Sequence, residues 1–91
     1  MIQVVCKEYI EEILRFPQYY VDDSEDLALL KVYDKNNIDN PTYIMIGCDE
    51  YEKYYLVVED NDTSEDYIPD DGETLSELFE KLLNKITKQN D

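Results

Sequence analysis

The segment TLSELFEKLLNKI at residues 74–86 decides the fold of this chain. Its apolar residues recur at i, i+3, i+4, i+7, i+8 and i+11, which is the spacing of one face of an α-helix. Thr74 followed by Glu77 forms a capping box at its start, and lysines gather toward its end, where cations interact favourably with the helix dipole. We therefore predict an amphipathic helix whose apolar face covers a sheet.

Three strand-like segments precede this helix. They are residues 27–33, residues 42–47 (TYIMIG) and residues 53–59 (KYYLVVE), and each is rich in β-branched or aromatic side chains. The turn-forming segments KNNIDNP and GCDEYE separate them. Such short connections predict an antiparallel meander.

A first helix is predicted over residues 3–16, because apolar side chains recur there at helical spacing and Pro17 stops the helix. Residues 2–5, IQVV, have no helical cap and could instead form a short strand. The sequence thus predicts a single α+β domain over residues 1–91. Its order is α-β-β-β-α, a three-stranded antiparallel meander with two helices packed on one face. The expected core sets Leu78, Phe79, Leu82 and Leu83 against Leu30, Val32, Ile44, Ile46 and Val57.

The strong negative charge of the chain restricts the kinds of molecule that it can bind. Twenty-three Asp and Glu face eight Lys and Arg, so the formal net charge is −15 at pH 7. Without a basic stripe, neither direct nucleic-acid binding nor attachment to anionic lipid is expected. The natural partners are cationic, either a basic groove of a protein or divalent metal ions.

The sequence predicts a cytoplasmic protein with reduced thiols. There is no targeting signal, no apolar stretch long enough for a membrane span, and no close pairing of Cys6 with Cys48. Both cysteines are expected to be buried as small apolar residues.

The sequence lacks the residues and motifs that commonly form catalytic sites. The chain has no His, and Gly47 and Gly72 are its two glycines, so a histidine base and a glycine-rich phosphate loop are both absent. Pairs of carboxylates arise by chance among so many acids. We expect no enzyme activity and no cofactor.

Residues 60–73, DNDTSEDYIPDDGE, are predicted to form an exposed acidic loop. Asp60, Asp62 and Ser64 match the first ligand positions of a calcium loop. However, Glu65 replaces the turn glycine and Asp71 replaces the bidentate Glu. A dedicated metal site is therefore not expected, although weak and nonspecific binding of divalent ions remains open.

The acids gather in segments between the predicted elements, where they could imitate the phosphates of DNA. A small domain needs a net charge of magnitude about 2–8 to stay soluble, so the net charge of −15 exceeds what solubility requires. Tyr51 and Tyr67 lie among the acids and are expected to act as interface anchors. The predicted partner-binding residues are Asp22, Asp23, Glu25, Asp26, Asp49, Glu50, Tyr51, Glu52, Glu59, Asp60, Asp62, Glu65, Asp66, Tyr67, Asp70 and Asp71.

In size, charge and element order the chain resembles small acidic inhibitors encoded by bacteriophages, including anti-CRISPR proteins that mimic DNA. That resemblance implies occupation of a basic DNA-binding groove inside a bacterial host cell. In addition, residues 57–83, VVEDNDTSEDYIPDDGETLSELFEKLL, are similar to the last strand, acidic loop and helix of toxin-immunity proteins of the SMI1/KNR4 type. This second resemblance implies neutralisation of a basic toxin, as an immunity protein or antitoxin.

Overall fold

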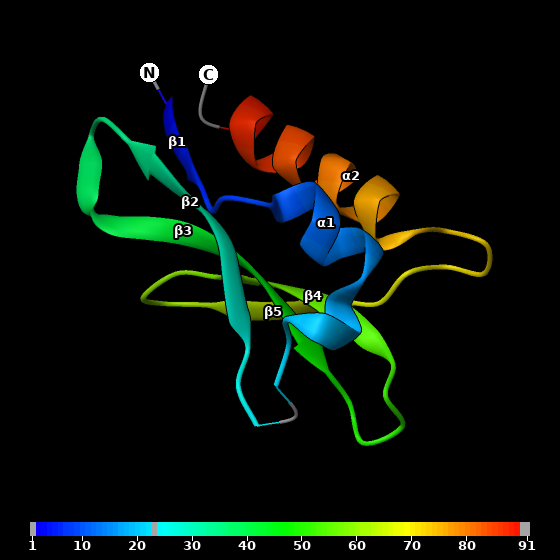
Figure 1. Ribbon diagram of the computed structural model, residues 1–91. Coiled ribbons are helices and arrows are strands. Elements are labelled where there is room, and N and C mark those ends of the chain that lie inside the picture. Colours follow the sequence, from blue (N-terminus) through cyan, green and yellow to red (C-terminus); the bar gives the residue numbers. More distant parts are fainter. Residues whose placement is uncertain (1, 23, 90–91) are drawn as a thin grey trace.

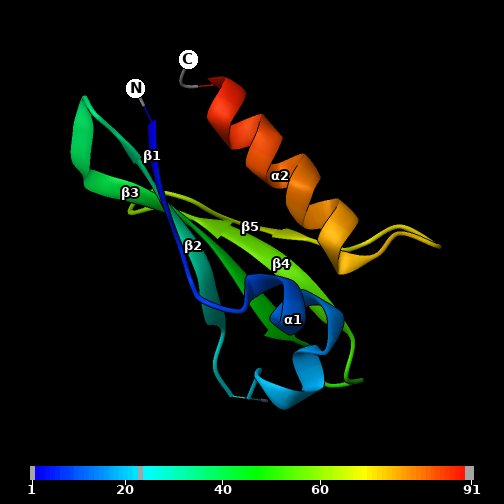
Figure 2. The same ribbon diagram turned by 45° about the horizontal axis from the view of Figure 1, so that its top comes forward.

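The computed structural model describes residues 2–22 and 24–89, which form an α+β fold (Figure 1). An open antiparallel sheet carries two α-helices on one of its faces, as Figures 1 and 2 both show. The elements are β1 (Ile2–Cys6), α1 (Ile10–Arg15), a 3₁₀ turn η1 (Pro17–Tyr19), β2 (Leu27–Asp34), β3 (Asn37–Cys48), β4 (Tyr54–Glu59), β5 (Ser64–Tyr67) and α2 (Leu75–Gln89).

The sheet has the order β1-β2-β3-β4-β5, and every neighbouring pair is antiparallel. The three-stranded meander predicted from the sequence forms the middle of this sheet as β2, β3 and β4. The prediction of three strands was wrong, because one further strand is added at each edge.

The first added strand is β1. It pairs with β2 in an uninterrupted register from Ile2↔Asp34 to Cys6↔Leu30. The predicted helix over residues 3–16 is therefore wrong in its first half, and the alternative of a short strand is confirmed. Helix α1 begins only at Ile10, after Tyr9 takes a left-handed φ of 66° and provides no side-chain cap.

The second added strand is β5, which lies inside the segment predicted to be a loop at residues 60–73. Residues 64–67 pair with β4 from Glu59↔Ser64 to Leu56↔Tyr67. Asp60 stabilises the preceding turn, since its Oδ1 accepts hydrogen bonds from the N–H groups of Asp62 and Thr63, both at 2.8 Å. Acidic loop structure is therefore confined to the turn at 60–63 and the link at 68–74.

Strand β3 is longer than predicted, because it starts at Asn37 and not at Thr42. The pairing with β2 is irregular between Val32↔Thr42 and Asp34↔Asn37, and Pro41 lies in this irregular stretch. Proline has no N–H to donate to a ladder, so it is tolerated at such a break in the register.

The core lies between the helices and one face of the sheet, which we call the covered face. Helix α2 is capped as predicted, with Glu77 N–H donating to Thr74 Oγ1 and Thr74 N–H donating to Glu77 Oε1, each at 3.1 Å. Leu83 is only half-buried against this core. Side chains of the buried cluster are Ile13, Leu14, Leu29, Leu30, Val32, Ile44, Ile46, Leu56, Leu78, Phe79, Leu82 and Ile86.

Three of the predicted buried positions need correction. Val57 is buried, but it pairs with Met45 on the opposite face of the sheet, the open face, whereas Leu56 faces the helices. Cys6 is exposed and Cys48 is half-buried, because β1 lies at the sheet edge and Cys48 ends β3.

Candidate partner-binding surface

One end of the sheet collects half of the predicted partner-binding residues. At this end β2 begins, β3 ends, β4 begins and β5 ends, so acidic residues before β2, in the β3–β4 turn and at the end of β5 lie at the same end of the meander. Figures 1 and 2 both show the link before β2 next to the turn between β3 and β4. We call this surface the acidic end. Its carboxylates are Asp22, Glu25, Asp26, Asp49, Glu50, Glu52 and Asp66, whereas Asp70 and Asp71 lie on the link from β5 to α2, where Asp70 is near Lys81.

Tyr55 lies at the centre of the acidic end, on the open face of the sheet. Its pKa is raised, first by burial of the phenol and then by the negative charges of Asp26, Asp66 and Asp49. These three carboxylates come from three different segments of the chain. The raised pKa of Tyr55 therefore reflects the convergence of acids that are distant in sequence.

Gly47 makes this convergence possible. A Cβ at this position would collide with Asp26 Oδ1 and would come within 3.0 Å of the Tyr55 hydroxyl oxygen. The missing side chain thus lets Asp26 and Tyr55 lie over the backbone of β3. A glycine in a strand interior often marks such a close approach.

A hollow of about 490 Å³ opens beside Tyr55. Its wall combines carboxylates with aromatic and aliphatic surface, and Lys53 is the one cation among its lining residues. The lining residues are Asp49, Lys53, Tyr54, Tyr55, Asp66 and Ile68. Ile68 is 77% exposed, so it adds apolar surface at this hollow.

The turn between β3 and β4 projects a second exposed anchor. Asp49 Oδ1 accepts hydrogen bonds from the N–H groups of Tyr51 at 2.8 Å and Lys53 at 2.9 Å. Glu52 takes a left-handed φ of 61° and donates its N–H to the Asp49 carbonyl oxygen. This bonding fixes the turn, and the Tyr51 side chain stays 75% exposed on it.

The structure does not bring all predicted residues to the acidic end. Glu59, Asp60 and Asp62 lie at the β4–β5 turn, at the opposite end of the sheet. Hydrogen bonds from the N–H groups of Asp62 and Thr63 lower the pKa of Asp60, so this carboxylate stabilises the β4–β5 turn. Asp23 lies outside the described residues.

Two further predicted residues interact with each other. Tyr67 donates its hydroxyl hydrogen to Glu65 Oε2, and its ring is half-buried against the core. Lys85 Nζ lies 5.5 Å from the centre of that ring. Tyr67 therefore belongs mainly to the packing under α2, and the exposed anchors are Tyr51 and Ile68.

Sequence reasoning missed Tyr55 and Ile68 as members of the site. The alternation of β4 contained a signal for Tyr55, because Tyr54, Leu56 and Val58 share one face and Tyr55 must share the other with Val57. Ile68 gave no signal, since its position depends on the pairing of β5.

Most carboxylates of the acidic end are not neutralised by nearby cations. Within residues 2–22 and 24–89, one pair of opposite charges has a nitrogen–oxygen distance below 4 Å. It joins Lys81 Nζ to Glu73 Oε2 at 2.6 Å. That contact lowers the pKa of Glu73 and raises the pKa of Lys81. The same described ranges contain no group of three or more Cys, Asp or Glu side chains arranged to hold a metal ion.

A scan against protein-family models and searches of curated proteins and of solved structures found no match. Neither helix in the described part of the chain has the length and apolar character that a membrane span requires. The function is therefore inferred from the geometry and charge of the acidic end.

Proposed function

We propose that this protein is an acidic inhibitor that binds a basic, nucleic-acid-binding surface of another protein by mimicking DNA. The observation that carries the proposal is the convergence of Asp26, Asp49 and Asp66 around Tyr55. Three acidic segments meet there, and Lys53 is the one cation that they contain. The protein acts by binding and not by catalysis, needs no cofactor, and works in the cytoplasm of a bacterial cell.

Electrostatics supports binding to a groove that normally holds phosphates. A groove that binds duplex DNA is lined with Lys and Arg and gains affinity by releasing counterions. Carboxylates projecting from three segments at one end of the sheet supply negative charge to the same side chains. Long-range attraction between such surfaces accelerates association and weakens as salt screens it.

The hollow beside Tyr55 suits one long cationic side chain. The aliphatic part of a Lys or Arg would pack on Ile68, while its charged group would face Asp49, Asp66 and the Tyr55 ring. Desolvated charge–aromatic contacts of this kind are stronger than exposed ion pairs. We therefore expect a Lys or Arg of the partner to occupy this hollow.

A second candidate function is neutralisation of a basic toxin, as an immunity protein or antitoxin. The observation that favours it is the exposure of Tyr51 and Ile68, because apolar anchors match a protein surface and have no counterpart in a phosphate backbone. Both functions use the acidic end. They differ in whether the occupied surface of the partner also binds DNA.

Affinity capture from a bacterial lysate, washed at low and then high salt, tests whether the acidic end binds a basic protein. We would compare two triple variants that each remove three negative charges. The test variant is Glu50→Gln, Glu52→Gln and Asp66→Asn at the acidic end. The control variant is Asp39→Asn, Glu59→Gln and Asp62→Asn, whose exposed carboxylates lie elsewhere.

We expect the test variant to lose the captured protein and the control variant to retain it. If both variants lose the protein equally, net charge alone is responsible and the acidic end is not the binding surface. Capture of a nucleic-acid enzyme supports DNA mimicry, whereas capture of a basic toxin supports the immunity function.

A further inference from the structure

Strand β1 forms an unprotected edge of the sheet. Its sequence, IQVVC, contains no charged residue and no proline, and its register with β2 has no bulge. The opposite edge strand β5 reads SEDY and carries two carboxylates. Natural sheets protect their edges with charges, prolines or bulges, because a bare edge pairs readily with another strand. A neutral edge strand is unexpected in a chain with a net charge of −15, and this indicates a functional role for β1.

The hydrogen-bonding groups of β1 that point away from the sheet can be assigned. Lys7 N–H donates to the Leu29 carbonyl oxygen of β2 at 2.8 Å, so Lys7 directs its backbone groups inward. Inward and outward residues alternate along an antiparallel strand. Val5 and Gln3 therefore also bond inward to β2. The N–H and C=O groups of Ile2, Val4 and Cys6 point outward from the edge.

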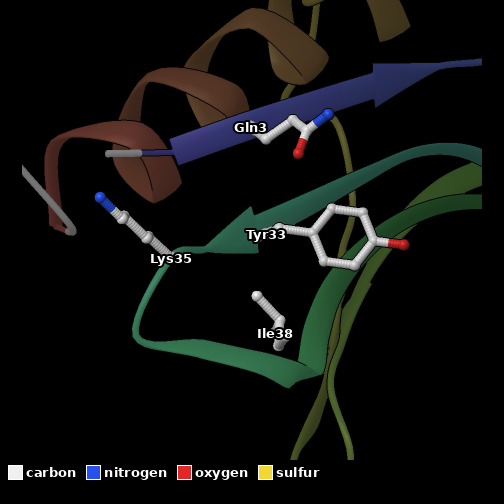
Figure 3. A pocket seen from close by; sticks show the side chains of 4 residues that line it. All are labelled: Gln3, Tyr33, Lys35 and Ile38. Atoms are coloured by element: carbon white, nitrogen blue, oxygen red, sulfur yellow. The ribbon is translucent and has the colours of Figure 1, made fainter.

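The side chains of β1 also leave apolar surface uncovered. Val4, on the covered face, is 39% exposed. Val5, on the open face, is 48% exposed. On the open face a mainly apolar hollow of about 320 Å³ lies next to Gln3, and Figure 3 shows Gln3, Tyr33, Lys35 and Ile38 around it. Apolar surface is thus available on both faces of the edge.

We propose that β1 pairs antiparallel with β1 of a second copy of this chain, with the two-fold axis at Val4. This register joins the outward backbone groups of Val4 to those of Val4 in the second copy, and those of Ile2 to Cys6. It also places Val5 of the second copy opposite Gln3, at the mouth of the hollow in Figure 3. Every cross-strand pair is neutral, so the edge is complementary to itself.

Charge favours this antiparallel arrangement of two copies. Strand β1 runs toward the acidic end, since Cys6 pairs with Leu30 near the start of β2. An antiparallel pair therefore directs the two acidic ends in opposite directions. The molecule is 39 Å along its longest axis, whereas charges are screened over about 8 Å at physiological ionic strength.

The surroundings of the edge also lack the repulsion found elsewhere on the molecule. Lys7 follows β1, and Lys31 of β2 lies over the rings of Tyr33 and Tyr43 at 4.9 and 5.4 Å. Among the β2 residues paired with β1, Lys31 and Asp34 are the charged ones, and their charges have opposite signs. A basic partner strand would gain nothing from such an edge, so a second copy is the occupant that the charges favour.

Sedimentation equilibrium across a concentration series tests the pairing. We expect the apparent mass to rise from 10.8 kDa toward about twice that value. The short strand predicts a weak dimer, of the class with a small interface. Added salt should not weaken the dimer, because its cross-strand pairs are neutral, whereas salt should weaken the proposed binding of a basic partner. The two proposals can therefore fail independently.

Variants at Val4 sharpen the test. Val4→Pro removes an outward N–H that β2 does not use, so the dimer should be lost while the melting temperature in dilute solution changes little. Val4→Lys keeps the backbone and sets two like charges opposite each other at the axis, so it should also remain monomeric. Val4→Thr is the matched control and should dimerise as the wild type does. A wild-type mass fixed at 10.8 kDa, or unchanged dimerisation of Val4→Pro and Val4→Lys, would overturn the proposal.

Discussion

Leu56 and Val57 are neighbours on β4, yet the sheet directs their side chains to opposite faces. Leu56→Ala removes three carbons from the cluster under the helices, which costs about 2.4 kcal/mol at about 0.8 kcal/mol for each buried carbon. The cavity that remains raises the expected loss to about 3–4 kcal/mol. Val57→Ala removes two carbons from the open face, where neighbours and solvent can fill the space, so about 1.5 kcal/mol is expected.

Double substitutions with Leu82 on α2 distinguish a side chain on the covered face of the sheet from one on the open face. Leu56 and Leu82 belong to one buried cluster, so their alanine substitutions should deviate from additivity by more than about 0.5 kcal/mol. Val57 and Leu82 are separated by the sheet, and their losses should add. Urea unfolding followed by circular dichroism measures all these free energies. Coupling of Val57 to Leu82, with additivity for Leu56, would show that the strand faces are assigned the wrong way round.

Three further outcomes are expected. Because the pKa of Tyr55 is raised in the fold, the unfolded chain loses this proton first, and stability falls as pH rises through the alkaline range. Tyr55→Phe should flatten that fall in a pH series of melting temperatures. An unchanged slope would contradict this prediction. The lowered pKa of Asp60 stabilises the fold above the ordinary pKa of an Asp and is lost as pH falls, so Asp60→Asn should make acid unfolding less steep in the same series. Thr74→Ala should lower the free energy of unfolding by about 1 kcal/mol through loss of the helix cap, while Thr74→Ser should retain it.

The clearest sequence predictions were those that depend on local periodicity. Helix α2 follows the apolar repeat that begins at Leu75, and its cap at Thr74 is visible as a short motif. Strands β2 and β4 follow from runs of β-favouring side chains. In these elements local propensity and tertiary packing agree, so the sequence alone is sufficient.

The edge strands could not be predicted with the same ease. The apolar residues of 3–14 have helical spacing, but pairing with β2 holds residues 2–6 in a strand, and that pairing is not local. Strand β5 contains two acids and offers Tyr67 as its one strand-favouring residue. Its conformation depends on the turn that Asp60 fixes and on the free edge of β4.

The acidic residues could be identified from the sequence, but their arrangement could not. The meander topology sends the segments with Asp26, Asp49 and Asp66 to one end of the sheet, and it sends Asp60 and Asp62 to the other. Only the register of the strands decides this division. The sequence therefore predicted the charge of the candidate site, and the strand pairing determines its location.

The central claim is that the acidic end occupies the DNA-binding surface of its partner. The most direct measurement is a competition titration in which labelled duplex DNA, bound to the captured partner, is challenged with this protein across a salt series. Wild type and the control triple variant at Asp39, Glu59 and Asp62 should displace the DNA, with potency that falls steeply as salt rises. The triple variant at Glu50, Glu52 and Asp66 should displace it poorly. A ternary complex of partner, DNA and this protein at every salt concentration would contradict DNA mimicry.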